Sequence, residues 1–350
     1  MMKLEWFSFD LFSGIGGLTE GLRKAGFNTL YAFEIDEIAS IAYSMNHVNT
    51  TVINKDIRDI NLEDIKQKLN GKKIHLLAGC PPCQGFSSIR RLNKANPIDD
   101  PRNDLINEYV RFVEFFNPYT IMLENVPWLE QDKLFIDAKE KLETMDYKID
   151  ATVVNVRDYG IPQNRKRLVM IGSRLGKISI AKPNKKKVTV RDCIGKLPKP
   201  ENSKDELHKI FPNHTETIRK IIKDIPHDGG SRKDLGDDRQ LICHTKENIG
   251  FNDVYGRLRW DDYSSTITGG CLNPSKGRFL HPDQDRCISA REAALLQSFP
   301  RKYLFPTDIP KANIALMIGN ALPPMFSYYQ ARNIRLHLEK FLKMPKEDFE

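Results

Sequence analysis

Apolar runs of strand length alternate with helical patterns along the first half of the chain. The strand candidates are Trp6–Phe12, Thr29–Ile35, Lys73–Gly79, Tyr119–Glu124, Ile149–Val156 and Arg167–Gly172. The helical patterns between them cover Leu18–Ala25, Asp36–Met45, Leu62–Leu69, Asp104–Phe116 and Lys133–Met145. This alternation favours an α/β fold, with a mostly parallel sheet covered by helices on both faces. In such sheets, ligands bind at the carboxyl ends of the strands.

The alternation ends near Ser173, and the next hundred residues are rich in Pro, Gly and charge. Residues 174–285 hold 22 Lys/Arg and 16 Asp/Glu, which is +6 of the formal +8 of the 350-residue chain. An excess of this kind indicates a separate, irregular, basic domain with a polyanionic partner, or only a solvated lysine-rich surface. Helical patterning returns at Ser289–Gln297, where Ser289 and Glu292 have capping-box spacing, and at Met325–Leu342.

A glycine-rich turn follows the first strand candidate, where residues 10–18 read DLFSGIGGL. Glycines permit positive φ and let a ligand approach the backbone closely. Glu34 ends the next strand candidate and could accept hydrogen bonds from ribose hydroxyls, and Asp56 with Ile57 could hold an adenine ring. A dinucleotide fingerprint would want a third glycine in place of Thr19. The pattern therefore favours a nucleoside without phosphates, with a tight turn that binds nothing as the alternative.

Two cysteines three residues apart lie in residues 79–87, which read GCPPCQGFS. Zinc would need two more ligands, and the sequence has no second closely spaced Cys/His pair, so no metal is expected. A thioredoxin-type pair should open a helix, whereas two prolines and a glycine favour a rigid loop. The interpretation that is left is a single presented nucleophile, Cys83, with Cys80 packed at the strand end; an inert thiol is the alternative.

Two further segments place charged side chains near strand ends. Glu124 opens the sequence ENVP directly after a strand candidate, so its carboxylate should face the same rim as Cys83. Residues 163–167, QNRKR, precede another strand, and their arginines could point at a base or a phosphate. An exposed strand-end carboxylate and solvated arginines are the plain structural alternatives.

In their order along the chain and in their residues, these motifs resemble those of the DNA cytosine-5 methyltransferase family of bacterial restriction-modification systems. The glycine turn, PCQ, ENV and QxRxR are followed by REAALLQSFP at 291–300 and GNALPP at 319–324, in family order. The six matches span nearly the whole chain. The resemblance implies a Rossmann-like, S-adenosylmethionine-dependent methyltransferase fold with a smaller, irregular target-recognition domain.

The resemblance also implies roles for particular residues and segments. The S-adenosylmethionine pocket is expected to contain Phe12, Gly14, Gly16, Glu34, Asp56, Ile57, Pro81 and Asn320. The catalytic group is expected to be Cys83, Glu124, Arg165 and Arg167. The expected domains are 1–173 for catalysis and cofactor binding, 174–285 for target recognition, and a segment 286–350 that returns to the catalytic domain.

The implied reaction explains why these residue types are needed. Carbon 5 of cytosine is a poor nucleophile until a thiolate, here that of Cys83, adds to carbon 6. Glu124 would meet ring nitrogen 3, Arg165 would hold the carbonyl of the base, and Arg167 would help to orient the loop. The cofactor donates its methyl group and leaves as S-adenosylhomocysteine. Because stacking covers carbon 6, the target base must be flipped out of the duplex.

Two segments of the basic region, YGRLRW at 255–260 and SSTITGG at 264–270, are the richest in groups that could read DNA. The residues expected to contact DNA are Arg257, Arg259, Thr266, Thr268 and Lys276. Leu258 and Trp260 are expected instead to pack in the core of the small domain.

Double-stranded DNA is the expected partner, bound by a monomer. By resemblance, a restriction endonuclease acts on the same site without forming a stable complex. The sequence has no long apolar span and no signal-peptide pattern, so we expect no membrane association and a cytoplasmic, nucleoid-associated bacterial protein. The six scattered cysteines fit a reducing compartment.

Three other interpretations compete with a DNA methyltransferase. A nicotinamide-dependent oxidoreductase would share the sheet but would leave Cys83, Glu124 and the basic region unexplained. A tRNA-methylating member of the same family is closer, but that branch differs after its Cys-Gln and lacks a large recognition domain. A DNA-binding relative without activity would not need an intact catalytic group.

Overall fold

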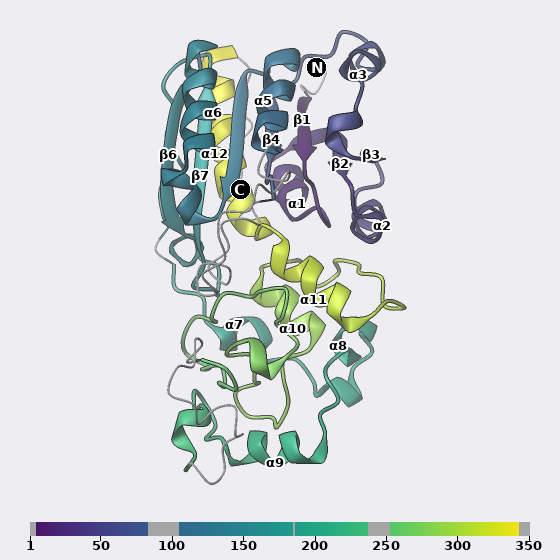
Figure 1. Cartoon of the computed structure of the whole chain (residues 1–350), viewed down its shortest axis with the longest axis vertical. Coiled ribbons are helices and arrows are strands. Elements are labelled where there is room, and N and C mark those ends of the chain that lie inside the picture. The colour runs from purple at the N-terminus through teal and green to yellow at the C-terminus, as the bar shows by residue number, and fades with distance from the viewer. Residues whose placement is uncertain (1–4, 83–104, 185, 237–252, 343–350) are drawn as a thin grey trace. The chain divides into compact units, whose positions relative to one another are not determined.

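The computed structural model describes residues 5–82, 105–184, 186–236 and 253–342 (Figure 1). The chain divides into two compact units. The first unit holds the residues up to 155, residues 166–183 and the segment from 324 onward, and the second holds 156–165 and 184–323. None of the described helices combines the length and the apolar character needed to cross a membrane.

A seven-stranded sheet lies at the centre of the first unit, in the order β3-β2-β1-β4-β5-β7-β6. The strands are β1 (Trp6–Leu11), β2 (Phe27–Glu34), β3 (Thr51–Asn54), β4 (Leu76–Gly79), β5 (Thr120–Asn125), β6 (Lys148–Asn155) and β7 (Lys166–Ser173). All neighbours from β3 to β5 pair in parallel, and β7 runs antiparallel to both β5 and β6. The predicted mostly parallel α/β sheet is confirmed.

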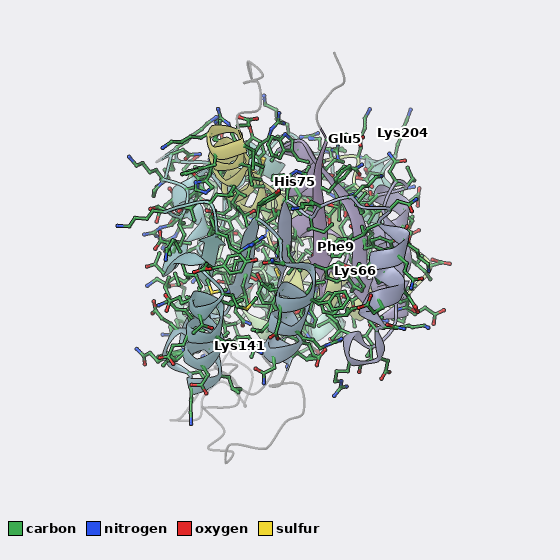
Figure 2. The ribbon with its side chains drawn as sticks, turned by 90° about the horizontal axis from the view of Figure 1, so that it is seen from above. Glu5, Phe9, Lys66, His75, Lys141 and Lys204 are labelled. Atoms are coloured by element: carbon green, nitrogen blue, oxygen red, sulfur yellow. The ribbon has the colours of Figure 1, made fainter. Side chains whose placement is uncertain are left out.

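Helices cover both faces of this sheet (Figures 1 and 2). One face carries α1 (Gly17–Lys24), α2 (Glu37–Asn46) and α12 (Pro324–Leu342), and the other carries α3 (Leu62–Lys68), α5 (Leu105–Phe116) and α6 (Lys133–Thr144). The 3-10 turns η1 (Ile57–Asp59) and η3 (Pro127–Gln131) lie in the connections. The C-terminal helix α12 packs directly on α1, where a Cβ added to Gly21 would lie 2.4 Å from Ser327 Cβ. Ser327 Oγ also donates a 2.7 Å hydrogen bond to the carbonyl of Leu18.

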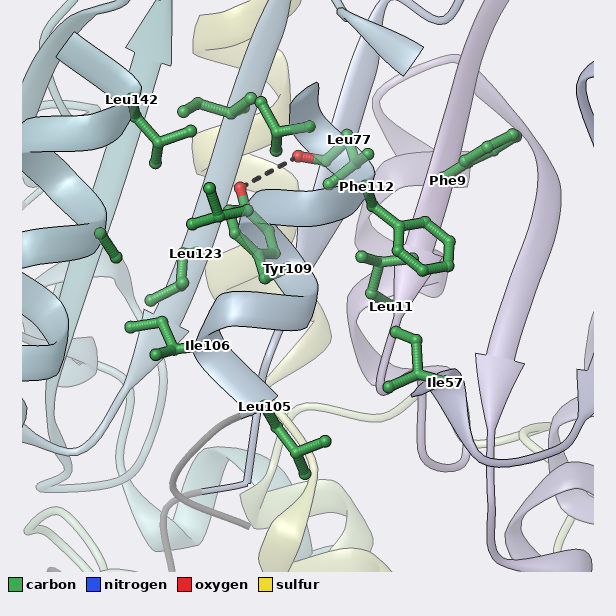
Figure 3. Close-up of a cluster of buried hydrophobic side chains, with 14 of the residues drawn as sticks. Phe9, Leu11, Ile57, Leu77, Leu105, Ile106, Tyr109, Phe112, Leu123 and Leu142 are labelled. Atoms are coloured by element: carbon green, nitrogen blue, oxygen red, sulfur yellow. Dashed lines mark hydrogen bonds between the residues drawn. The ribbon is translucent and has the colours of Figure 1, made fainter. Parts of the chain in front are cut away.

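Alternate strand residues build the core between the sheet and α3, α5 and α6 (Figure 3). Phe9 and Leu11 of β1 point to this face, as expected from the two-residue period of a strand. Tyr109 of α5 lies among them fully buried, and its hydroxyl approaches the carbonyls of Met122 at 3.0 Å and Leu77 at 3.4 Å. Each large apolar side chain buried here contributes roughly 1.5–3 kcal/mol to folding. The core therefore fixes the strand ends that position the site.

The second unit is irregular and contains short helices. They are α7 (Val190–Ile194), α8 (Glu206–Lys209), α9 (Glu216–Asp224), α10 (Ala290–Leu296), α11 (Lys311–Asn320), and the 3-10 turns η4 (Val156–Tyr159), η5 (Pro200–Asn202), η6 (Arg232–Asp234) and η9 (Pro274–Lys276). The expected capping box of α10 is present: Ser289 Oγ accepts from Glu292 N at 3.1 Å, and Glu292 Oε2 accepts from Ser289 N at 2.6 Å.

The boundaries of the two compact units differ from those of the expected domains. Residues 174–183 belong to the first unit, and 156–165 and 286–323 belong to the second. The reason is packing, because α10 contacts α7, α8 and α11, all within the second unit. The functional domains proposed from the sequence stay a prediction.

Candidate functional site

The carboxyl ends of four adjacent parallel strands gather predicted residues at one edge of the sheet. Leu11 of β1 is the register partner of both Phe33 and Gly79, and Gly79 is in turn the partner of Leu123. The residues that directly follow these four are Phe12, Glu34, Cys80 and Glu124. Three candidate site residues that are far apart in the sequence, Phe12, Glu34 and Glu124, therefore lie with Cys80 at the same edge of the sheet, where α/β folds bind ligands.

The glycine turn between β1 and α1 is held by Glu34. Phe12, Gly14 and Gly16 have positive φ values of 58°, 53° and 86°, respectively. Gly14 N donates to Glu34 Oε2 at 2.7 Å, and Asp36 N donates to Glu34 Oε1 at 2.8 Å. A Cβ added to Gly14 would have no neighbouring atom within 4 Å, so the turn borders open space. A side chain here would be strained by φ alone.

Glu34 is suited to hold hydroxyl groups. Burial raises the pKa of its carboxyl, and the N–H groups of Asp36 and Gly14 oppose that shift. Each carboxylate oxygen accepts one of these hydrogen bonds and can accept one more, because an ionised carboxylate offers about four acceptor positions. The open space at Gly14 and the spare acceptor capacity of Glu34 fit the ribose of a nucleoside cofactor.

Asp56 and Ile57 lie where β3 passes into η1. Asp56 caps η1, and its Oδ1 accepts from Arg58 N at 3.0 Å and from Arg58 Nε at 2.9 Å. The side chain of Arg58 lowers the pKa of Asp56, so that this carboxyl stays ionised and is purely an acceptor. Ile57 is buried, and its carbonyl accepts from Arg111 Nη2 at 2.7 Å. The pair offers an acceptor beside an apolar side chain, as an adenine ring requires.

The chain leaves β4 along the carboxyl edge toward the predicted nucleophile. Cys80 N donates to Leu11 O at 3.2 Å, which places Cys80 at the end of the strand. Pro81 is buried, and its carbonyl oxygen accepts from Asn125 Nδ2 at 2.9 Å. Cys83 lies outside the described residues. The segment that leads to it is thus hydrogen-bonded to the residue next to Glu124.

Glu124 and Arg167 form an ion pair, with Arg167 Nε 2.9 Å from Glu124 Oε1. They come from β5 and β7, which pair antiparallel with Glu124 opposite Val169. Both side chains are largely buried, at 8% and 16% exposure. Burial lowers the pKa of Arg167, and the charge of Glu124 opposes that shift. Two residues from separate motifs are therefore brought together as a largely buried ion pair.

Two other candidates, Arg165 and Asn320, belong to the second unit. The Arg165 side chain is buried, and its Nη1 donates at 3.0 Å to the carbonyls of both Ile267 and Gly319. Asn320 is the exposed last residue of α11. Within this unit, the QNRKR, SSTITGG and GNALPP motifs therefore meet at one arginine side chain.

Arg257 has no donor left for DNA. Its side chain is 0% exposed, and its N–H groups reach five acceptors within the second unit. The acceptors are Ile222 O, Ile225 O, His281 O, Gln284 O and Asp285 Oδ1, at 2.5–3.1 Å. This burial does not fit the expected DNA contact, because a guanidinium has only five N–H donors. We therefore assign Arg257 to the interior of this unit.

The other expected DNA contacts have different settings. Arg259, Thr268 and Lys276 are exposed. Thr266 is half-buried, and its Oγ1 donates to Asn164 O at 2.8 Å. Trp260 is packed as expected, with its Nε1 donating to Asp283 Oδ2 at 2.8 Å.

Three buried polar side chains near the glycine turn form a row of hydrogen bonds that the sequence analysis did not predict. Thr19 Oγ1 donates to Asp10 Oδ2 at 2.6 Å, and the Tyr43 hydroxyl donates to Thr19 Oγ1 at 2.8 Å. Burial raises the pKa of Asp10 to about 7, the neighbouring charge of Glu34 also raises it, and the Thr19 hydrogen bond opposes this. A charged residue inside an otherwise apolar strand is the signal that could have found it. In the described residues, no cluster of His, Cys, Asp or Glu is arranged to hold a metal ion.

Comparison with known proteins gives matches along almost the whole chain. Residues 7–335 match the model of the family described as C-5 cytosine-specific DNA methylase. The type II methylase M.HgiDII of Herpetosiphon aurantiacus is 34% identical, over 94% of this chain and 95% of that protein. The type II methyltransferase M1.HphI of Haemophilus parahaemolyticus is 32% identical, over 91% of this chain and 83% of that protein.

Solved structures also match almost the whole chain. A candidate DNA modification methyltransferase encoded within a prophage (E. coli) has a TM-score of 0.75 and 25% identity, covering 97% of this chain and 100% of that chain. The Entamoeba histolytica methyltransferase EhMeth has a TM-score of 0.66 at 18% identity, covering 96% of this chain and 99% of that one. At that identity, the second likeness shows a shared fold.

Proposed function

This chain belongs to the family of C-5 cytosine-specific DNA methylases, and from that premise we propose how its residues carry the reaction. It is a DNA cytosine-5 methyltransferase of the type II restriction-modification kind. We propose that it methylates carbon 5 of a cytosine flipped out of duplex DNA, using S-adenosylmethionine and a transient bond between Cys83 Sγ and carbon 6.

One observation carries the mechanistic proposal. Asn125 bonds the carbonyl of Pro81, two residues before Cys83, and directly follows Glu124, which is held by Arg167. The segment that leads to Cys83 is thus hydrogen-bonded to the residue next to Glu124, at the carboxyl edge of the sheet. A base that reacts with both groups needs this arrangement, because addition at carbon 6 and proton delivery to nitrogen 3 occur on one ring.

The cofactor would occupy the open side of the glycine turn. S-adenosylmethionine supplies an electrophilic methyl group when bound. Glu34 would accept from the ribose hydroxyls, and Asp56 beside Ile57 would hold the adenine ring. The other residues of the proposed pocket are Phe12, Gly14, Gly16, Pro81 and Asn320.

The proposed reaction begins at Cys83. The Cys83 thiolate forms a bond to carbon 6, and the π pair of the carbon 5–carbon 6 double bond shifts to carbon 4–carbon 5. The carbon 4–nitrogen 3 π pair then moves onto nitrogen 3, which takes a proton through Glu124. Carbon 5, now nucleophilic, would take the methyl group, with S-adenosylhomocysteine as the leaving group. Water then removes the proton from carbon 5, the sulfur–carbon bond breaks to release the thiolate, and nitrogen 3 returns its proton to Glu124. Arg167 orients Glu124 throughout, and Arg165 is proposed to hold the base carbonyl.

Target reading is proposed for the exposed groups of the basic region. Arg259, Thr268 and Lys276 can reach phosphates or base edges, and Thr266 supports the loop. Because the matched relatives are type II methylases, we propose that the methylation protects host DNA in the cytoplasm from an endonuclease that cleaves the same site. The enzyme would act as a monomer, without a stable complex with that endonuclease.

The proposed function is tested by transfer of labelled methyl groups from S-adenosylmethionine. We expect incorporation into duplex DNA, with bisulfite sequencing of host DNA giving the target site, and no incorporation into tRNA. Cys83→Ala should abolish transfer and leave binding of DNA and cofactor detectable. Incorporation into tRNA alone, or appreciable turnover by Cys83→Ala, would refute the proposal.

A further inference from the structure

The segment that carries Arg165 is fixed against the proposed target-reading loop. Ser264 N donates to Pro162 O, and Asn164 N donates to Ser264 O, both at 2.8 Å. Gln163 and Ser264 form a parallel bridge, and Thr266 adds its side-chain bond to Asn164 O. Three consecutive residues, 162–164, thus lie edge to edge with the loop, all within the second unit.

The backbone of Ile267 is held from both sides by side chains. Its N–H donates to Gln163 Oε1 at 2.9 Å, and its carbonyl accepts from Arg165 Nη1 at 3.0 Å. The Ile267 side chain is fully buried, whereas its neighbour Thr268 is exposed. Ile267 therefore links an exposed reading position to the arginine of the catalytic motif.

Gln297 continues this connection to α11. Gln163 Nε2 donates to Gln297 Oε1, and Gln297 Nε2 donates to Ile318 O at 2.8 Å and to Ala321 O at 3.0 Å. Both glutamine side chains have 0% exposure. The two carbonyls flank Gly319 and Asn320, so the chain of bonds ends at the proposed cofactor residue.

The backbone of α11 also packs directly against the backbone of the reading loop. A Cβ added to Gly319 would lie 2.1 Å from the carbonyl carbon of Thr268 and 2.2 Å from Gly269 N. Only glycine fits there, so α11 touches the reading loop with no side chain between them. The Arg165 guanidinium bonds Gly319 O at this point as well.

The chemistry of the two glutamines indicates a positioning function. A buried amide pays a desolvation cost that an apolar side chain of the same size avoids. What the amide adds is a donor and an acceptor on one rigid fork, which lets one side chain bond two backbone segments. Gln163 and Gln297 each use one amide function on a backbone segment and the other on the partner glutamine, and the result is one fixed arrangement of three motifs.

We propose that Gln163 and Gln297, called here the glutamine clamp, are positioning residues for methyl transfer. The clamp holds Arg165, the reading loop at Thr268, and Asn320 as one rigid body, so that a correctly read site sets the catalytic arginine. This inference rests on the proposed function. It assigns the glutamines no contact with the substrate.

The clamp makes a specific kinetic prediction. Misplacement of a catalytic group by about 1 Å can cost 100-fold in rate, whereas binding depends on contacts that the clamp does not make. Gln163→Met and Gln297→Met keep the side-chain length and remove the amide. Each should lower the single-turnover methylation rate at saturating DNA and cofactor about 10- to 100-fold. The KM values for DNA and cofactor should change by less than about threefold.

Two features separate positioning from simple stability. The double variant should be no slower than the slower single variant, because residues that act as a unit are not additive. Gln330→Met is the matched control, since Gln330 is also fully buried and accepts from Ala181 N at 2.9 Å, but in the first unit. At equal folded fraction it should keep its rate within about twofold of the unmodified protein.

A second measurement does not depend on activity. Hydrogen exchange of the peptide containing Ile267 should accelerate in Gln163→Met and not in Gln330→Met, because the Ile267 N–H bonds Gln163. If Gln163→Met does not fold, Gln163→Asn shortens the arm by one methylene and gives the same comparison. Unchanged exchange, or rates within twofold of the unmodified protein in both clamp variants, would overturn the inference. Absence of methylation by the unmodified protein would refute the proposed function and leave the exchange test of the clamp intact.

Discussion

Asn125 Nδ2 donates a 2.9 Å hydrogen bond to the carbonyl oxygen of Pro81, two residues before the proposed nucleophile. Asn125 Oδ1 also accepts from Val126 N at 2.8 Å, so the amide of Asn125 is oriented by its own strand end. The bond joins the carboxyl ends of β4 and β5, and through them the path to Cys83 and the Glu124 carboxylate.

We predict that Asn125→Ala slows methyl transfer more than it weakens binding. The variant loses a buried hydrogen bond, which should cost about 1–3 kcal/mol of unfolding free energy. It also frees the segment before Cys83, so kcat should fall while the dissociation constants of DNA and cofactor stay within about threefold. Single-turnover kinetics and calorimetric titration measure the two effects.

Tyr147→Phe is the control for that prediction. The Tyr147 hydroxyl donates to Pro118 O at 2.7 Å, a buried bond of the same type before the start of β5. Its removal should reduce stability by a similar amount and leave kcat unchanged in the folded protein. Equal losses of kcat in the two variants would show that Asn125 acts only through stability.

A second prediction concerns the cofactor. Glu34→Gln replaces one acceptor oxygen by an amide donor, which would face a backbone N–H of Gly14 or Asp36. We expect about 10- to 100-fold weaker binding of S-adenosylmethionine by calorimetry, and unchanged DNA binding in its absence. Glu37→Gln, at the exposed start of α2, should leave both unchanged. Equal cofactor affinity in the two variants would remove Glu34 from the pocket.

A third prediction follows from the buried carboxyl of Asp10, whose pKa is raised from 3.8 to about 7. As pH rises from about 4 to about 7, the unfolded chain releases this proton before the folded chain does. Folding therefore loses up to roughly 4 kcal/mol from this group over that range. Asp10→Asn cannot ionise and can still accept from Thr19, so it should be more stable than the unmodified protein at pH 7.

Urea denaturation at pH 4.5 and pH 7.5 tests this prediction. The stability gained by Asp10→Asn should be small at the lower pH and should grow toward the higher one. The pKa values of His47 and His75 are lowered to about 4 by burial, which favours folding as pH rises. Both histidines are present in both proteins, so their contribution cancels. A gain that is equal at the two pH values would contradict the assignment.

A fourth prediction separates two arginines that are two residues apart. Arg257→Met removes the donor partner of five acceptors, three of them in buried bonds, and should destabilise the second unit by several kcal/mol. Arg259→Ala removes an exposed cation and should leave stability within about 0.5 kcal/mol. If Arg259 contacts a phosphate, its loss should reduce the slope of log affinity against log salt by about one. An unchanged salt slope would remove Arg259 from the DNA surface.

The sequence predicts the regular part of the fold well because that part depends on local pattern. The capping box of α10 was visible as Ser289 and Glu292, and six strand candidates correspond to strands of the sheet. The pattern misses β3, a four-residue strand with no buried residue, since so short a run has no clear period. It also misses α11, in which Gly319 is dictated by contact with a distant loop.

The site is predictable in its residue types and less so in its geometry. The carboxyl ends of parallel strands lie at one edge of a sheet, so the sequence alone predicts that Glu34 and Glu124 lie at the same edge. The burial of Arg257 depends on carbonyls from two segments distant in sequence, 222–225 and 281–284, and no local pattern encodes that. From the sequence alone, an arginine in a basic region such as Arg257 is interpreted as a DNA contact, because its partners in the fold are not visible there.

The most direct test of the central claim is covalent trapping on duplex DNA that carries 5-fluorocytosine at the target position. Fluorine at carbon 5 cannot leave as a proton, so the sulfur–carbon bond formed at carbon 6 should persist after methyl transfer. We predict a denaturation-resistant complex whose adduct maps to Cys83 by mass spectrometry. An adduct on Cys80, or methylation of ordinary duplex with no trapped complex, would contradict the proposed attack by Cys83.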